Sequence, residues 1–201
     1  MIFCRLDLYF FPILDIYTPI DRTILGYKEL FSPIRRFSMK KAAVIHDLSG
    51  FGKCSLTAAI PVLSALGVQC CPVATAVLTG QTGYPCYHCT DLTAMLPDYI
   101  DAWGKNNAHF DAIYSGFLTG AEQISQVLDF IRQFREEHTL LLVDPVMGDD
   151  GNAYPFFTPG LLNGMKELTL KADVITPNLT EACLLADIPE NALLHCRTNT
   201  D

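Results

Sequence analysis

Basic residues are scarce in this sequence, which has 14 Lys and Arg against 22 Asp and Glu and a formal charge of −8 at pH 7. Proteins that bind nucleic acids usually present a basic face to the phosphate backbone. The charge balance therefore predicts no nucleic-acid partner and favours a small molecule as the ligand.

The sequence also lacks an uninterrupted apolar run of the length that spans a membrane. Its first 20 residues are apolar and aromatic, but Arg5, Asp7, Pro12 and Asp15 interrupt them, whereas a spanning helix needs about 20 mostly apolar residues in succession. The segment is a poor signal peptide too, because no basic residue precedes its apolar part and no small-residue cleavage site follows cleanly. We expect no membrane partner.

A complete set of zinc ligands is missing as well. Cys86 and Cys89 have a CxxC spacing, but no second CxxC or CxxH pair follows to supply four tetrahedral ligands. The eight cysteines are an even number, yet a chain of 201 residues with half of them hydrophobic needs no disulfide framework. We expect reduced thiols in a cytoplasmic protein, and the role of the Cys86/Cys89 pair stays open.

The character of the sequence changes at Met39, where a charged start leads into the apolar run Ala42–Ile45. The hydrophobic content is enough for one domain with a sizeable core. We expect Met39 to be the natural start, residues 1–38 to be an extension outside the core, and residues 39–201 to form the domain.

From Met39 onward, apolar strands alternate with helical segments. Strands are expected at 42–46, 68–75, 111–114, 139–143 and 173–176, and helices at 55–66, 91–103, 121–138, 159–170 and 178–186. Continuous apolar strands separated by helices are typical of a parallel sheet with helices on both faces. Ligands of such sheets bind outside the carboxyl ends of the strands, so the loops that follow the strands are the candidate site.

The most acidic of these loops is DPVMGDDG, residues 144–151, directly after a predicted buried strand. A carboxylate at the end of a buried strand is costly to desolvate unless a cation or several donors meet it. A magnesium ion, which prefers oxygen ligands and water, would satisfy Asp144 and Asp149. A structural role also fits, with the proline fixing the chain and the glycines supplying positive φ angles.

A second polar loop, TPNLTE, follows the last predicted strand. Asn178 and Glu181 have the spacing of a capping box, which satisfies the free amides of a helix start without any ligand. In the functional alternative, the two side chains hold waters around the same magnesium ion.

The glycine loop SGFGK, residues 49–53, leads into a predicted helix. It matches neither the phosphate-binding pattern GxxxxGK[ST] nor the dinucleotide pattern GxGxxG. We therefore expect this loop to line the site of a small organic substrate.

Five segments in order resemble the ribokinase-like vitamin kinases, the pyridoxal kinases most and the hydroxymethylpyrimidine phosphate kinases next. The segments are HDLSGFGKCSLTAAIPVLSALG, ATAVLTGQTGYP, YSGFLTG, LLVDPVMGDDG and ADVITPNLTEACLL. The resemblance covers residues 40–188. It implies a three-layer α/β/α sandwich with a mostly parallel sheet.

This resemblance also implies an activity. In these enzymes ATP, with Mg²⁺, transfers its γ-phosphate to a hydroxymethyl group on a pyridine or pyrimidine ring. The implied function is phosphorylation of pyridoxal, pyridoxine and pyridoxamine in vitamin B6 salvage, by a homodimer. The alternatives are the hydroxymethylpyrimidine (phosphate) kinase of thiamin synthesis and a non-catalytic protein that only binds the vitamin.

Roles carry over from the family by position. The acidic loop and the TPNxxE segment imply sites for ATP and its phosphates (Asp144, Asp149, Thr176, Asn178, Glu181), three of which are also implied metal ligands (Asp144, Asp149, Glu181). The substrate ring is implied to contact four residues (His46, Asp47, Thr82, Phe117). His46 replaces a serine common in pyridoxal kinases, Phe117 replaces a tyrosine, and Asp47 stands where pyrimidine kinases carry an aspartate, so the choice of ring stays open.

The family's catalytic Gly-Thr-Gly-Asp segment has no match in the sequence. Nothing in residues 188–201 fits it, and Asp201 lacks the glycines around it, so no catalytic base is assigned. The resemblance thus implies a kinase fold that is incomplete at its C-terminal end, and we expect these 201 residues alone to show little kinase activity.

Overall fold

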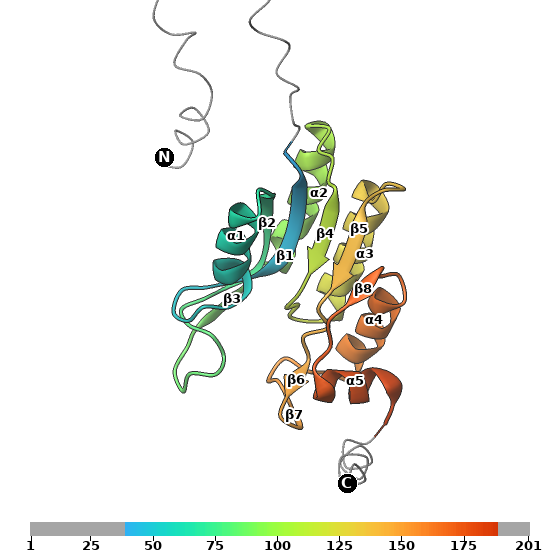
Figure 1. The fold of residues 1–201 in the computed structure, drawn as a ribbon. Coiled ribbons are helices and arrows are strands. Elements are labelled where there is room, and N and C mark those ends of the chain that lie inside the picture. Colours follow the sequence, from blue (N-terminus) through green and yellow to red (C-terminus); the bar gives the residue numbers. More distant parts are fainter. Residues whose placement is uncertain (1–38, 189–201) are drawn as a thin grey trace, which may run out of the picture. The chain divides into compact units, whose positions relative to one another are not determined.

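The chain folds around a six-stranded sheet. The computed structural model describes residues 39–188, and among them the strands lie in the order β3-β2-β1-β4-β5-β8 (Figure 1). Their bounds are Lys41–Ser49 (β1), Gln69–Leu78 (β2), Cys89–Asp91 (β3), Ala112–Ser115 (β4), Leu140–Val143 (β5) and Val174–Ile175 (β8). All neighbouring strands are parallel except β2 and β3. The prediction of a mostly parallel sheet is confirmed.

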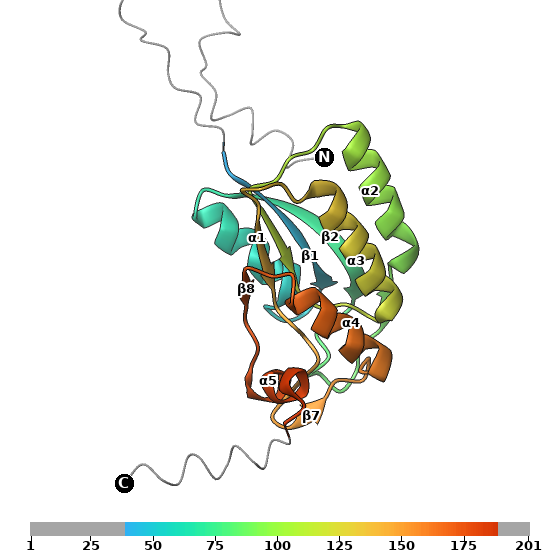
Figure 2. The same cartoon turned by 90° about the vertical axis from the view of Figure 1, so that its right-hand side faces the viewer.

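Helices cover both faces of this sheet (Figures 1 and 2). On one face lies α1 (Ser55–Ala65), whose buried Leu56 belongs to the same cluster as Val44 of β1. The other face carries α2 (Leu96–Lys105), α3 (Ala121–Phe134) and α4 (Pro159–Thr169). A shorter helix, α5 (Leu179–Ala186), follows β8. The predicted three-layer α/β/α arrangement is confirmed.

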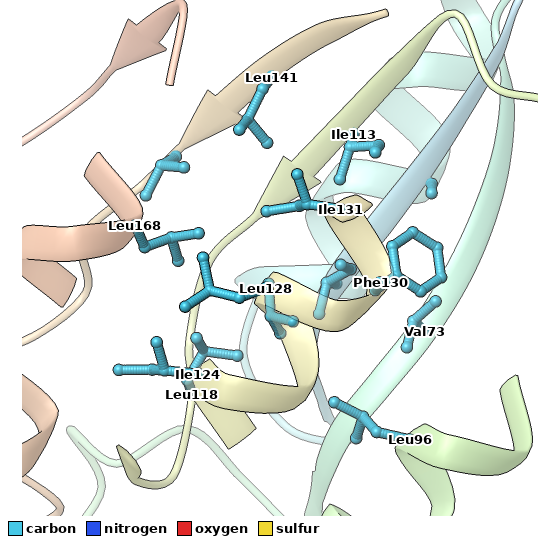
Figure 3. Packing of buried hydrophobic residues seen from close by; sticks show 14 of the residues in the cluster. Val73, Leu96, Ile113, Leu118, Ile124, Leu128, Phe130, Ile131, Leu141 and Leu168 are labelled. Carbon is cyan, nitrogen blue, oxygen red and sulfur yellow. The ribbon is translucent and has the colours of Figure 1, made fainter. Parts of the chain in front are cut away.

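The main hydrophobic core lies between the sheet and α3 (Figure 3). Hydrophobic residues recur along α3 at the three- and four-residue spacing of one helix face. The four that the sequence places on this face are all buried in the core (Ile124, Val127, Leu128, Ile131). They pack in one cluster with residues such as Ile113 of β4 and Leu141 of β5.

The expected helix start at Asp91 is wrong. Asp91 ends β3, an antiparallel edge strand in which Thr90 pairs with Val77 of β2. The Asp91 carboxylate accepts the N–H of Thr93 (2.7 Å) at a 3-10 turn, Thr93–Met95, and α2 begins only at Leu96. The strand forms because an open sheet edge offers partners that the local sequence does not reveal.

Helix α3 ends at Phe134, four residues earlier than expected. Arg135 has an extended backbone (φ −80°, ψ 118°). Its guanidinium donates to both carboxylate oxygens of Asp173 (2.9 Å each) and to the carbonyl oxygen of Lys171 (2.6 Å). These contacts across 36 to 38 residues of sequence favour leaving the helix over adding another turn.

Two expectations concern residues outside the described range. They are the extension 1–38 and the segment 189–201, to which the search for the Gly-Thr-Gly-Asp motif extended. Among residues 39–188, no helix has the length and apolar character needed to cross a bilayer.

Candidate active site

A cavity of about 250 Å³ opens beside the carboxyl ends of the central strands. Its lining includes all four residues predicted to contact a substrate ring and one of the predicted acidic residues (His46, Asp47, Thr82, Phe117, Asp144). Parallel strands bring their carboxyl ends to one edge of the sheet, which explains why residues 46 and 144 meet. The other predicted residues, Asp149, Thr176, Asn178 and Glu181, do not line this cavity.

His46 and Asp47 form a buried pair at the end of β1. Their side chains are 7% and 6% exposed, and His46 Nδ1 lies 2.9 Å from Asp47 Oδ1. The other carboxylate oxygen of Asp47 accepts the hydroxyl of Ser49 (2.8 Å). Burial opposes the charge on Asp47, but hydrogen bonds from His46, Ser55 and Ser49 together outweigh it and hold the pKa of Asp47 below its usual range.

An irregularity in strand pairing accompanies this pair. From the pair His46 and Ala74 to the pair Leu48 and Val77, β1 advances two residues and β2 three. The extra residue of this bulge lies on β2, beside the position of Asp47 on β1. Both His46 and Asp47 line the cavity next to it.

Gly116 leaves the space that the ring of His46 occupies. A Cβ at position 116 would lie 2.1 Å from Cδ2 and 2.2 Å from Nε2 of His46. The edge-to-face ring of Tyr114, 6.0 Å away, and the N–H of Phe117, 3.2 Å from Nδ1, complete the surroundings of the imidazole. Sequence reasoning placed Gly116 in a candidate loop but missed this role, because the contact joins β1 to the loop after β4.

Asp144 follows β5 and faces the same cavity. Burial raises the pKa of its carboxyl group, while His46 and a hydrogen bond from Thr176 lower it in part. The hydroxyl of Thr176 donates to Asp144 Oδ1 at 3.2 Å. A partly buried carboxylate with one neutral donor keeps lone pairs for a hard cation, so this donor set fits Mg²⁺.

Within residues 39–188, no three His, Cys, Asp or Glu side chains form a group that could hold a metal ion. Magnesium usually binds one or two carboxylates and completes its shell with waters and substrate phosphates. A site built on Asp144 is compatible with that habit. Asp149 and Glu181 as further metal ligands stay predictions.

Asn178 and Glu181 form the capping box that their spacing predicts. Asn178 Oδ1 accepts the N–H of Glu181, and Glu181 Oε2 accepts the N–H of Asn178, both at 2.9 Å. The structural interpretation of this segment is therefore confirmed. The role of the two residues towards ATP stays a prediction.

Sequence reasoning also missed several cavity residues outside the family's implied contacts. Cys54 and Ser55 line the cavity at the start of α1, and Val146 and Tyr154 line it from the segment around the acidic loop. The signal for the first two was their place directly after the glycine loop, which was already expected to line a substrate site.

Replacing Asp47 by Asn is expected to lower the unfolding midpoint at pH 7, and the difference from the native protein should shrink below about pH 4. A carboxyl group whose pKa is lowered by folding stabilises the folded state at pH values above its pKa in the unfolded chain, which is near 3.9. That contribution disappears as the pH falls through the lower pKa of the folded state. Thermal unfolding from pH 3 to pH 7 measures it, with the exposed Asp98 changed to Asn as control. An unchanged midpoint at pH 7 contradicts the expectation.

Comparison with known proteins agrees with this geometry. A profile of the phosphomethylpyrimidine kinase family matches residues 52–199, more than half of the chain. The pyridoxine/pyridoxal/pyridoxamine kinase of Bordetella avium is 35% identical over 143 residues, which is 67% of this chain and 47% of that protein. The chain thus spans about half the length of this curated relative.

Solved structures show the same similarity. A protein of Bacteroides thetaiotaomicron crystallised with pyridoxal is 49% identical and superposes with a TM-score of 0.74 over 76% of this chain and 53% of its own. The pyridoxal kinase of Lactobacillus plantarum is 35% identical, with a TM-score of 0.70 over 76% and 54% of the two chains. With this fold, a cavity at its strand ends and a matching family profile, the chain belongs to the phosphomethylpyrimidine kinase family and is similar to pyridoxal kinases.

Proposed function

We propose that this chain forms the vitamin-binding part of a kinase that uses ATP and Mg²⁺ to phosphorylate the hydroxymethyl group of pyridoxal, pyridoxine and pyridoxamine. The observation that carries the proposal is that His46, Asp47 and Asp144 line one cavity. A site for a ring and a site for a cation are then close enough to serve one reaction. The similar Bacteroides protein crystallised with pyridoxal supports the choice of a B6 vitamer.

The residues divide into two groups by chemistry. His46, Asp47, Thr82 and Phe117 surround the ring, with polar groups to orient it and an aromatic face to contact it. Asp144 places a negative charge at the carboxyl end of β5, where Mg²⁺ would neutralise charge that develops on the transferred phosphoryl group. Phosphoryl transfer depends mostly on positioning and electrostatics, which is what these residues supply. We assign no catalytic base among residues 39–188.

The proposal extends to the setting of the reaction. We place the domain at residues 39–201, as the N-terminal portion of a ribokinase-like kinase, and its work in cytoplasmic B6 salvage. The family resemblance supports a homodimer, which sedimentation analysis would establish.

Competition binding tests the choice of substrate. Pyridoxal should bind the 201-residue chain. Hydroxymethylpyrimidine should displace bound pyridoxal only when its concentration is roughly tenfold or more above that of pyridoxal. The reverse order would favour the pyrimidine kinase, an alternative that the matching family profile keeps open. Binding of pyridoxal without binding of magnesium-ATP would instead favour a vitamin-binding protein. Phosphorylation of pyridoxal in the presence of magnesium-ATP tests the activity itself.

A further inference from the structure

The acidic loop and the start of α5 are tied together by hydrogen bonds. Residues 148–149 (β6) and 152–153 (β7) pair as a short antiparallel hairpin, which lies beside α5 in Figure 1. Asn178 Nδ2 donates to the carbonyl oxygen of Gly148 (2.8 Å), and the N–H of Gly151 donates to Thr180 Oγ1 (2.9 Å). Two side chains at the helix start therefore bind the backbone of the hairpin.

Glu181 adds a third tie, and it does so with a carboxylate that is almost fully buried. The residue is 4% exposed. Its Oε2 accepts the N–H of Asn178 (2.9 Å), which is the ordinary capping-box bond. Its Oε1 accepts the N–H of Met147 (3.2 Å), a residue of the acidic loop that is itself buried. One carboxylate thus joins two segments separated by more than 30 residues of sequence.

The hairpin itself leaves little freedom at the point where it is held. A Cβ at Gly148 would lie only 2.4 Å from the carbonyl oxygen of Asn152, so the two strands approach as closely as a glycine allows. Asp149 follows directly on Gly148 in β6. The contacts at residues 147, 148 and 151 thus hold the backbone on both sides of Asp149.

We propose that Glu181 is a positioning residue, which holds residues 147–151 of the acidic loop against the start of α5 and so sets where Asp149 stands. Its effect on nucleotide binding rests on the proposed function, but the tie between loop and helix does not. The sequence implied that Glu181 ligates a metal ion. That role stays a prediction, but in the structure each of its oxygens already accepts a backbone N–H, which gives it a role through the loop as well.

Hydrogen exchange on the whole chain tests the tie directly. Glu181→Gln keeps one acceptor but replaces the other with an NH₂ group that faces a backbone N–H. The amides of residues 147–151 should exchange about 10- to 100-fold faster, as expected for losing a buried bond to a charged acceptor. Amides of β1 should keep their native rates. Glu122→Gln is the matched control, because Glu122 is an exposed acidic residue in the first turn of α3.

A second variant separates the bond to the hairpin from the capping bond of the helix. Asn178→Asp retains Oδ1 as the acceptor for the N–H of Glu181 but loses the donor to Gly148. Exchange should again be faster in residues 148–151, while the amides of α5 remain protected. This variant also keeps the test informative if Glu181→Gln does not fold.

The affinity for magnesium-ADP distinguishes a positioning role of Glu181 from a purely structural one. Both variants should weaken magnesium-ADP binding about tenfold and leave pyridoxal binding unchanged. Native exchange rates in Glu181→Gln, together with a raised Mg²⁺ requirement, would overturn the proposal and make Glu181 a ligand. If the native chain binds no magnesium-ADP, the nucleotide part of the proposed function fails, while faster exchange still establishes the tie and native exchange still overturns it.

Discussion

Gly116→Ala is expected to weaken pyridoxal binding by about 10- to 100-fold, because the new methyl group occupies the place of the His46 ring. The added Cβ would stand 2.1 to 2.2 Å from two ring atoms, which no adjustment of a few tenths of an ångström relieves. The imidazole must turn away, and it would lose its bond to Asp47 and its place in the cavity. Overpacking of this kind also costs about 1–3 kcal/mol of unfolding free energy.

The same loop provides the control for this variant. Gly120 has an extended backbone, and a Cβ there meets nothing within 4 Å. Gly120→Ala should therefore bind pyridoxal with native affinity. Titration calorimetry with pyridoxal, combined with thermal unfolding, separates loss of the site from loss of the fold. Native affinity in Gly116→Ala would show that the position of His46 does not matter for the ligand.

Asp144→Asn is expected to weaken the binding of magnesium-ADP by about 10- to 100-fold, because the side chain loses the charge that would hold Mg²⁺. The neutral amide keeps the shape of the side chain but no longer attracts Mg²⁺. The stability of the folded state should increase. Burial raises the pKa of Asp144, so its charged form destabilises the folded state at pH 7, and the variant should unfold at a higher temperature than the native protein.

Asp150→Asn is the matched control for this second variant. Asp150 lies exposed in the same loop with a positive φ of 48°, a conformation that asparagine also adopts. It should keep the native affinity for magnesium-ADP and the native Mg²⁺ requirement. Binding is measured by titration calorimetry with ADP in the presence of Mg²⁺, and any loss of affinity should be compared with the change in unfolding midpoint. If Asp144→Asn is less stable and also binds magnesium-ADP more weakly, Asp144 has a structural role only.

The sheet was predictable because its signals are local. Residues 42–45 of β1 and the whole of β5 are uninterrupted apolar runs, and α3 shows its buried face in the spacing of Ile124, Val127 and Ile131. The edge strand β3 and the hairpin around Gly148 were not predicted. Both form because other parts of the chain offer partners, Val77 for the strand and α5 for the hairpin.

For the candidate site, too, the sequence predicted which residues take part but not the contacts that hold them. Position at a strand end, together with family resemblance, points to His46 and Asp144, and both line the cavity. What the sequence could not show is how each side chain is held. The space at Gly116 and the second bond of Glu181, to Met147, are contacts between distant segments, and neither leaves a periodic or compositional trace.

The bulge between β1 and β2 has a consequence for anyone who wishes to transfer this site to another scaffold. Thr75 lies in β2 beside this bulge, and its carbonyl oxygen accepts two hydrogen bonds from outside the sheet. The donors are the side-chain amide of the fully buried Gln123 and the backbone N–H of Leu92. A design that copies His46 and Asp47 would therefore have to copy the irregular pairing of the neighbouring strand as well. It would also need Gln123, which holds the backbone of that strand at Thr75.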